Sequence, residues 1–185
     1  MRTLLVVWFV LLGHPALADT EAAQLAYAAQ QLPDNALTPT TAQRLVEVAL
    51  LVAGDDLDPA VLLAQAYIES RFDPTATSRK VRGSRRTGSW PSSQPPPFTG
   101  NLYCGIAQTQ ATTWAACLQL RDPAIAVSAQ AFELREWLRR TRGDVALALA
   151  GYGCGNAGLK HGCRGYPGRV LAVAKRLRPR VRPLS

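Results

Sequence analysis

The sequence is poor in the residues that most often carry nucleophilic or metal chemistry. It has only two histidines and four cysteines among 185 residues. His14 lies in the apolar N-terminal segment, which leaves His161 for the folded domain. A Ser-His-Asp or Cys-His site therefore has almost no support. The cysteines form none of the close pairs that bind zinc, so we predict no metal and no cofactor.

Long apolar runs are also missing, apart from one at the N-terminus. Arg2 is followed by the apolar stretch Leu4 to Leu12, and then by Ala16-Leu17-Ala18, a small-x-small cleavage pattern. The stretch is short for a bilayer span, and Asp19 follows the cleavage pattern directly. We therefore predict a signal peptide over residues 1–18 and a periplasmic or secreted protein. An uncleaved membrane anchor is the alternative.

Acidic residues are scarce relative to basic ones, and none follows Asp144. The chain has 21 Lys and Arg against 13 Asp and Glu, a net charge of +8. Five of the cations crowd one segment: Arg79, Lys80, Arg82, Arg85 and Arg86. Such a field favours polyanions, including cell-wall polymers and anionic lipid surfaces. Because the chain is expected to be exported and has no recognition motif, we predict no nucleic-acid partner.

The cysteines are an even set in a chain expected to be exported, which predicts two disulfides. The spacing leaves the connectivity open. We favour the two local pairings, Cys104–Cys117 and Cys154–Cys163, because they close the shortest loops.

Helical patterns dominate the chain, and alternating strand patterns are almost absent, which predicts a mainly α single domain over residues 19–178. Cap and proline signals open three helices, at Thr38-Pro39, Asp58-Pro59 and Asp122-Pro123. Further helices are expected over 20–31, 111–117, 145–152 and 166–177. Residues 79–100 are basic and rich in Gly, Ser and Pro, and are predicted to form a long inserted surface loop. Residues 179–185 form a basic tail.

The helix that begins after Asp58-Pro59 carries the main candidate for chemistry, Glu69. Pro74 disfavours helical geometry in the residue before it, so the helix should end near Asp73 and hold Glu69 in its last turn. Apolar or aromatic residues flank this glutamate: Tyr67, Ile68 and Phe72. Desolvation by such neighbours raises the pKa of a carboxyl group. The alternative is a solvated glutamate at a helix end.

Three separated segments now form a pattern. Glu69-Ser70-x-Phe72-x-Pro74-x-Ala76-x-Ser78 resembles the catalytic segment of the lytic transglycosylases of the lysozyme-like superfamily. Gly105-Ile106-Ala107-Gln108 resembles that family's Gly-Leu-Met-Gln segment, and Ala148-Leu149-Ala150-Gly151-Tyr152 resembles Ala-Leu-Ala-Ala-Tyr-Asn-Ala-Gly. The three occur in the family's order, which implies a lysozyme-like fold and cleavage of peptidoglycan.

The resemblance implies roles residue by residue. Glu69 matches the single catalytic acid/base. Ser70 sits where the family often has a hydroxyl that supports the acid or the substrate. Gln108 matches a glutamine that lines the glycan cleft, and Tyr152 matches a tyrosine that points at the catalytic carboxylate. Ser78, which ends the first segment, is assigned to substrate binding with them.

A glycosidic oxygen must be protonated as its bond breaks, which needs a carboxyl that still holds a proton near neutral pH. Most glycosidases add a second carboxylate. The nearby acids have structural interpretations, since Asp73 lies past the helix end and Asp122 and Asp144 are typical helix caps. A single acid fits a substrate-assisted route. As the resemblance implies, the muramyl N-acetyl group then stabilises the anomeric carbon and a 1,6-anhydro ring closes.

The sequence departs from the family pattern at three places. Gly153-Cys154-Gly155 follows Tyr152 where the family has Asn, so Asn156 either takes that role through a shifted turn or the role is lost. Ala107 replaces Met and should make a smaller cleft wall. The basic insertion, 79–100, should emerge near the cleft. It would contact anionic glycan, dock a partner such as an envelope-spanning secretion complex, or simply be solvated.

The sequence therefore predicts an exported lytic transglycosylase, expected as a monomer. Two other functions stay open. One is a muramidase that uses water and needs a second positioned acid or another base. The other is a glycan-binding or secretion-apparatus accessory that keeps the fold without turnover.

Overall fold

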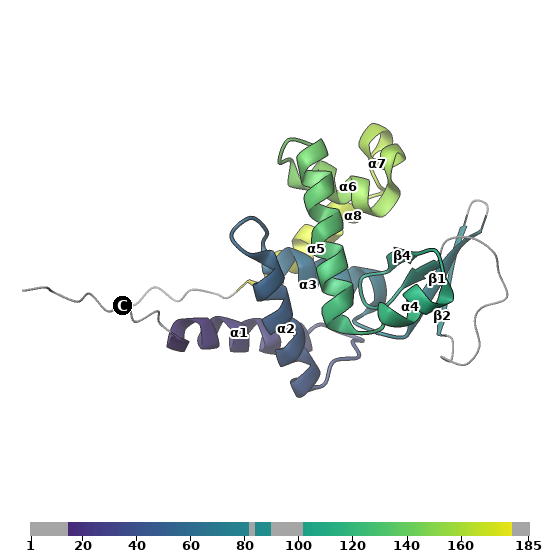
Figure 1. Ribbon diagram of the computed structural model, residues 1–185. Helices are drawn as coiled ribbons and strands as arrows, with labels where there is room; N and C mark the ends of the chain where they lie inside the picture. Colours follow the sequence, from purple (N-terminus) through teal and green to yellow (C-terminus); the bar gives the residue numbers. More distant parts are fainter. Residues whose placement is uncertain (1–14, 82–83, 90–101, 179–185) are drawn as a thin grey trace, which may run out of the picture.

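The structure is a computed structural model that describes residues 15–81, 84–89 and 102–178 (Figure 1). The predicted tail and most of the predicted signal peptide lie outside these residues. The predicted cleavage after Ala18 falls in the first turn of helix α1 (Pro15–Gln30). The signal peptide stays a prediction. No helix in the described part of the chain combines the length and the apolar character needed to cross a bilayer.

The fold is mainly helical, with one small antiparallel sheet at one end of the molecule (Figure 1). The other helices are α2 (Pro39–Ala53), α3 (Pro59–Ser70), α4 (Trp114–Gln119), α5 (Pro123–Arg140), α6 (Val145–Cys154), α7 (Asn156–His161) and α8 (Tyr166–Leu177). The strands are β1 (Ala76–Val81), β2 (Ser84–Ser89), β3 (Leu102–Cys104) and β4 (Thr109–Ala111), in the order β2-β1-β3-β4.

The helix starts predicted at Thr38-Pro39, Asp58-Pro59 and Asp122-Pro123 are confirmed, because each is fixed by a local cap. Thr38 accepts a hydrogen bond from the Thr41 backbone at the start of α2, and Asp58 accepts one from the Ala60 backbone, at 2.8 Å, at the start of α3. Asp122 caps α5 in the same way. A side-chain oxygen in this position satisfies a backbone N–H that the helix cannot.

Helix α3 is the centre of the core. Eight consecutive residues, Ala60 to Tyr67, are buried, and α3 packs against α2, α5 and α8. A helix buried on all sides has no solvent face, which explains its nearly continuous apolar sequence. Its end is fixed by Arg71, whose φ of 59° and ψ of 32° are left-handed. The expected helix end just before Asp73 is therefore confirmed.

A second, smaller core lies under the sheet, around Leu102, Ala111 and Leu120. The disulfide Cys104–Cys117 crosses it and joins β3 to α4. The disulfide Cys154–Cys163 joins the end of α6 to the segment before α8. Both favoured pairings are confirmed.

The sheet corrects the predicted insertion. Residues 79–81 and 84–89 are not an irregular loop but belong to β1 and β2, which pair from Ala76–Ser89 to Val81–Ser84. Their sequence has no apolar alternation, so the backbone pairing left no periodic signal. Residues 90–101, with Trp90, lie outside the described part of the chain. The helix predicted from Ala111 begins instead at Trp114, because Thr109 to Ala111 pair with β3.

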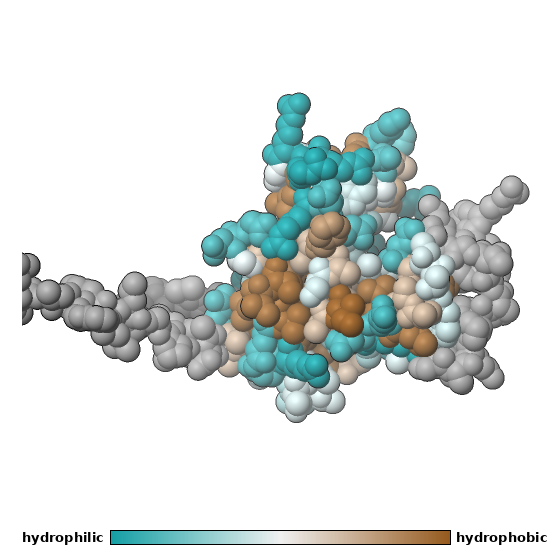
Figure 2. Space-filling view, viewed as in Figure 1, coloured by the Kyte–Doolittle hydropathy of each residue, from teal (hydrophilic) through white to brown (hydrophobic). Residues whose placement is uncertain are grey.

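Apolar side chains also reach the surface where α2 and α5 pack together, as the brown region across the middle of Figure 2 shows. Leu51 of α2 is 81% exposed, and Ile125 and Phe132 of α5 are exposed as well. This region carries none of the predicted site residues.

Candidate active site

Glu69 lies in the last turn of α3, half-buried, directly before the residues that end the helix. The chain leaves through two consecutive left-handed residues, Arg71 and Phe72. The Arg71 guanidinium lies over the Tyr67 ring at 4.3 Å, and Phe72 is buried beside that ring. The backbone around Glu69 is therefore held on both sides, by a packed helix and by a packed turn.

The turn Gly105–Gln108 joins the three predicted segments. Ser70, from the first segment, donates its hydroxyl hydrogen to the carbonyl oxygen of Ile106 at 2.8 Å. Tyr152, from the third segment, donates its hydroxyl hydrogen to the next carbonyl oxygen, that of Ala107, at 3.0 Å. Three stretches that are far apart in the sequence thus meet at two adjacent peptide groups.

Gln108 and Ser78 are shielded from solvent, at 4% and 1% exposure. Gln108 Nε2 donates to the carbonyl oxygens of Ala76 and Gly105, both at 3.0 Å. Because two acceptors fix the amide orientation, Oε1 is left as a buried acceptor with no hydrogen-bond partner among the described residues. Ser78 Oγ on β1 is buried in the same unpartnered state.

Ala107 lies in the core, and Asn156 lies on the surface. Ala107 is 0% exposed, so its side chain belongs to the core and is not an open wall of the cleft. Asn156 is exposed at the first position of α7, where its Oδ1 accepts a hydrogen bond from Arg140 Nη2 at 2.6 Å. That contact ties α7 to α5, not to the Gly105–Gln108 turn.

The three acids set aside in the sequence have the structural roles expected of them. Asp122 accepts from the Ala124 backbone at the start of α5, and Asp144 accepts from the Leu147 backbone at the start of α6. Asp73 accepts from the backbone and the hydroxyl of Thr75 in the turn after α3.

Sequence reasoning missed Tyr166, the first residue of α8. Its hydroxyl oxygen is buried and has no hydrogen bond of ordinary geometry among the described residues. Burial raises the pKa of Tyr166, and the negative charge of nearby Glu69 raises it further. The phenol therefore stays protonated beside Glu69 and can donate a hydrogen bond toward the carboxylate. Tyr166 begins a helix after a glycine-rich turn, and nothing in that local sequence indicates that its phenol lies beside Glu69.

Sequence reasoning also missed Glu133 on α5, which is half-buried. Burial raises the pKa of Glu133, hydrogen bonding by the Trp137 side chain lowers it, and the negative charge of Glu69 raises it. Two carboxylates therefore lie within electrostatic reach of each other. The signal in the sequence is Gln130, Glu133 and Trp137 at helical spacing on one face of α5.

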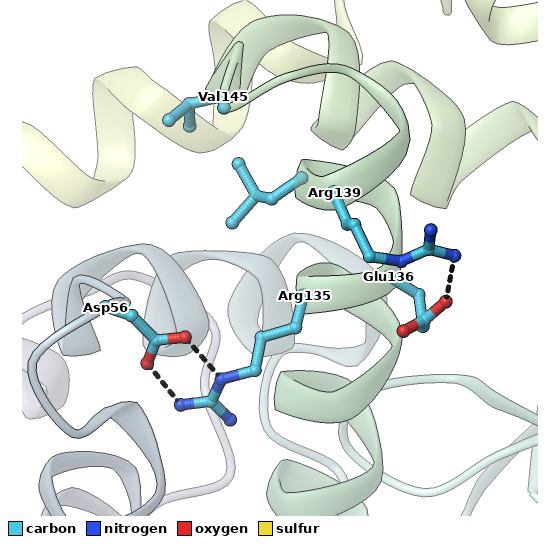
Figure 3. Close-up of a pocket in the computed structure, with 7 residues that line it drawn as sticks. Asp56, Arg135, Glu136, Arg139 and Val145 are labelled. Atoms are coloured by element: carbon cyan, nitrogen blue, oxygen red, sulfur yellow. Dashed lines mark hydrogen bonds and ion pairs between the residues drawn. The ribbon is translucent and has the colours of Figure 1, made fainter.

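A separate hollow of about 450 Å³ lies between α5 and the start of α6, and Glu69 does not line it. Figure 3 shows Arg135 reaching Asp56, with Nη2 to Oδ1 at 2.6 Å, and Arg139 paired with Glu136 at 3.0 Å. Because these charges neutralise one another at the surface, the hollow offers no unpaired group for chemistry.

Replacing Tyr152 with phenylalanine is expected to lower the free energy of unfolding by about 1 to 2 kcal/mol. The buried carbonyl of Ala107 loses its donor while the ring stays in place. Urea unfolding at unchanged m-value measures this loss. Tyr27→Phe is the control, because Tyr27 is 66% exposed and its change should stay within about 0.5 kcal/mol. Equal losses in the two variants would contradict the prediction.

A scan against protein families matches residues 53–165 to the model described as Transglycosylase SLT domain. Comparison with curated proteins and with solved structures finds no match. The matched residues run from the end of α2 to the residue before α8, so they contain Glu69, the Gly105–Gln108 turn and Tyr152. Since the match covers more than half of the chain, the protein belongs to the Transglycosylase SLT domain family, the lysozyme-like lytic transglycosylases that act on peptidoglycan.

Proposed function

We propose that the protein cleaves the β-1,4 bond between N-acetylmuramic acid and N-acetylglucosamine and releases a 1,6-anhydro-muramyl end, with Glu69 as the single acid/base. The observation that carries this proposal is the meeting of the three segments at the Gly105–Gln108 turn, through the hydroxyls of Ser70 and Tyr152. It links the segment that carries Glu69 to both other segments, through hydrogen bonds made by Ser70 and Tyr152. Rigid support of this kind is what a catalytic group needs.

In the proposed reaction, protonated Glu69 gives its proton to the glycosidic oxygen as the bond from that oxygen to the anomeric carbon breaks. The N-acetyl oxygen of the muramyl sugar bonds to the anomeric carbon. Ionised Glu69 then takes the proton from the C6 hydroxyl, whose oxygen displaces the acetyl oxygen and closes the ring. Glu69 ends as it began, protonated, and no water is consumed.

The surroundings of Glu69 support both halves of this cycle. Half-burial and the charge of Glu133 disfavour a second negative charge, which helps the pair to hold a proton before the bond breaks. The neutral phenol of Tyr166 can then stabilise the carboxylate that forms. Ser70 acts through the turn and not directly on the sugar, because its hydroxyl hydrogen goes to Ile106.

We propose further that Gln108 and Ser78 contribute from beneath the cleft, since both side chains are buried. The basic segment that includes β1 and β2 offers positive charge to anionic glycan or to a partner protein. Action on peptidoglycan fits a location outside the cytoplasm, as the N-terminal sequence predicts.

The test is product analysis. Purified protein is incubated with purified peptidoglycan, and the released fragments are analysed by mass spectrometry. We expect anhydro-muramyl ends, which are lighter by one water than reducing ends. Reducing ends would instead support a muramidase, a reading favoured by the proximity of Glu133 to Glu69. No release at all would support a glycan-binding module.

A further inference from the structure

The part of the chain after Asp144 carries an unbalanced positive charge. Residues 145–178 contain six Lys and Arg and no Asp or Glu. One of the six is neutralised from outside this stretch, since Arg178 pairs with Asp58 at 2.6 Å. The other five are exposed, and none has an ion pair or side-chain hydrogen bond with another described residue: Lys160, Arg164, Arg169, Lys175 and Arg176. These five charges are available to a ligand.

Arg164 stands between two buried residues in the turn that joins α7 to α8. Cys163 and Tyr166 are 8% and 6% exposed. Both pack on Gly153 of α6, since a Cβ added there would lie 2.9 Å from Tyr166 Cδ1 and 3.1 Å from Cys163 Sγ. The disulfide from Cys163 to Cys154 also ties the turn to the end of α6. Arg164 is therefore an exposed residue on a backbone that is fixed on both sides.

The turn between α7 and α8 packs directly beside the candidate site. The glycine on which it packs follows Tyr152, which donates its hydroxyl hydrogen to the Ala107 carbonyl oxygen at 3.0 Å. The carbonyl group before that one accepts from Ser70, the residue after Glu69. A continuous series of contacts therefore leads from the turn that carries Arg164 to the segment that carries the proposed acid.

Two further cations flank Arg164 in the chain. Lys160 lies in the last turn of α7, and Arg169 lies in the first turn of α8. We call Lys160, Arg164 and Arg169 the cationic turn. The remaining two, Lys175 and Arg176, lie in the last turn of α8. Since a helix rises 1.5 Å per residue, they are about 9 Å or more beyond Arg169 along the helix axis.

We propose that the cationic turn binds the acidic peptide stems of the peptidoglycan whose glycan strand Glu69 cleaves. This inference rests on the proposed function and names the feature of the substrate that the site selects. Each stem is attached to a muramyl sugar, the sugar at which the bond breaks, and carries carboxylates. Carboxylates accept charge-assisted hydrogen bonds from ammonium and guanidinium groups, and the planar guanidinium of Arg matches both carboxylate oxygens. Strands with charged stems should therefore bind more tightly than strands with neutral ones.

The extent of the cationic turn favours a local ligand over a membrane surface. Clusters of about four to eight cations hold a protein to an anionic bilayer. The cationic turn has three, on a backbone that packing on Gly153 and a disulfide hold in place. A rigid frame of this kind loses little conformational entropy when it binds a carboxylate.

The test is the binding of soluble glycan strands with a fluorophore at one end, measured by fluorescence anisotropy. The strands carry intact stems, stems whose carboxylates are converted to neutral amides, or no stems. Arg164→Gln should bind the intact strands about 3- to 10-fold more weakly than the parent, as expected for one exposed hydrogen bond to a charged group. It should bind the amidated strands as the parent does. Arg164→Lys keeps the charge and should retain most of the affinity.

Two variants serve as matched controls. Lys175→Gln removes one charge from the far end of α8. Arg142→Gln removes one from the turn between α5 and α6, at the opposite end of α6 from Tyr152; Arg142 is exposed and left-handed, as Arg164 is. At 0.15 M salt, charges more than about 8 Å apart are largely screened, so both controls should bind intact strands as the parent does.

Unchanged binding of intact strands by Arg164→Gln would overturn the proposal. So would an equal loss on all three kinds of strand, which would assign the turn to the sugars, or an equal loss in Lys175→Gln, which would leave only a diffuse field. Loss of binding to phosphatidylglycerol vesicles, with strand binding unchanged, would assign the turn to a membrane and overturn it too. If Arg164→Gln does not fold, Arg164→Gly replaces it, because glycine readily adopts the left-handed backbone found there.

Anisotropy reports binding whether or not the strands are cut, which separates this inference from the proposed function. The comparison is repeated in the Glu69→Gln background, so that strand cutting does not alter the signal. Binding that depends on stem charge, in a protein that releases no anhydro-muramyl ends, would refute the proposed function alone. Release of anhydro-muramyl ends by a protein whose affinity does not depend on stem charge would refute this inference alone.

Discussion

Replacing Glu69 with glutamine is expected to lower the rate of peptidoglycan cleavage about 10²- to 10⁴-fold, the usual contribution of a positioned general acid. Glutamine keeps the shape of the side chain at the end of α3 but has no proton to give and no carboxylate to take one back. Both halves of the proposed cycle therefore fail together. Initial rates of fragment release, quantified by mass spectrometry, measure the effect.

The control is Glu47→Gln on the exposed face of α2, where the carboxylate accepts a hydrogen bond only from Gln43 among the described residues. It should cleave at the parent rate. Circular dichroism and urea unfolding check that Glu69→Gln is folded. A folded Glu69→Gln that cleaves as fast as the parent would remove Glu69 from the mechanism.

The second large effect is expected at Gly105, where alanine should lower the free energy of unfolding by about 2 to 5 kcal/mol. A Cβ at this position would lie 1.8 Å from the carbonyl oxygen of Leu120, a backbone atom that has no side-chain freedom to move away. The φ of 71° adds the left-handed penalty of a residue with a side chain. Urea unfolding measures the loss.

Gly143→Ala separates the two causes. Gly143 has a φ of 84° but nothing within 4 Å of an added Cβ, so only the backbone penalty of about 1 to 2 kcal/mol applies. Equal losses in Gly105→Ala and Gly143→Ala would contradict the contact with Leu120. We also expect Gly105→Ala to cleave more slowly where it is still folded, because the displaced turn carries the acceptors for Ser70 and Tyr152.

The start of a helix was predictable where a capping residue lies directly before it in the sequence. Asp58, Asp122 and Asp144 each accept a hydrogen bond from a backbone N–H two or three residues later in the chain. Both partners of each cap are therefore close together in the sequence. The two disulfides followed from short loops in the same way. The strands were not predictable, because β1 pairs with β2 and β3 through backbone groups and carries cations where an apolar pattern would be expected.

The residues of the candidate site also fall into those that a local sequence pattern indicates and those that only the packing of helices brings together. The three segments around Glu69 were visible as residue patterns, and the turn does bring them together. Tyr166 left no signal in the sequence, and Glu133 left only its helical spacing with Gln130 and Trp137. The packing of α5 and α8 against α3 is what brings both residues near Glu69. The buried orientation of Gln108 also depends on a local detail, its left-handed φ of 50°.

Both bonds that hold the site together end on main-chain oxygens, those of Ile106 and Ala107. Every residue has such an oxygen, so the anchoring is indifferent to which side chains stand at 106 and 107 as long as the turn keeps its course. Natural or engineered variation at these two positions is limited to apolar side chains of suitable volume, since both positions are buried in the core. Alanine in place of methionine at position 107 therefore keeps the hydrogen bonds from Ser70 and Tyr152 to the turn. The size of the buried side chains at 106 and 107 can change while these two bonds remain.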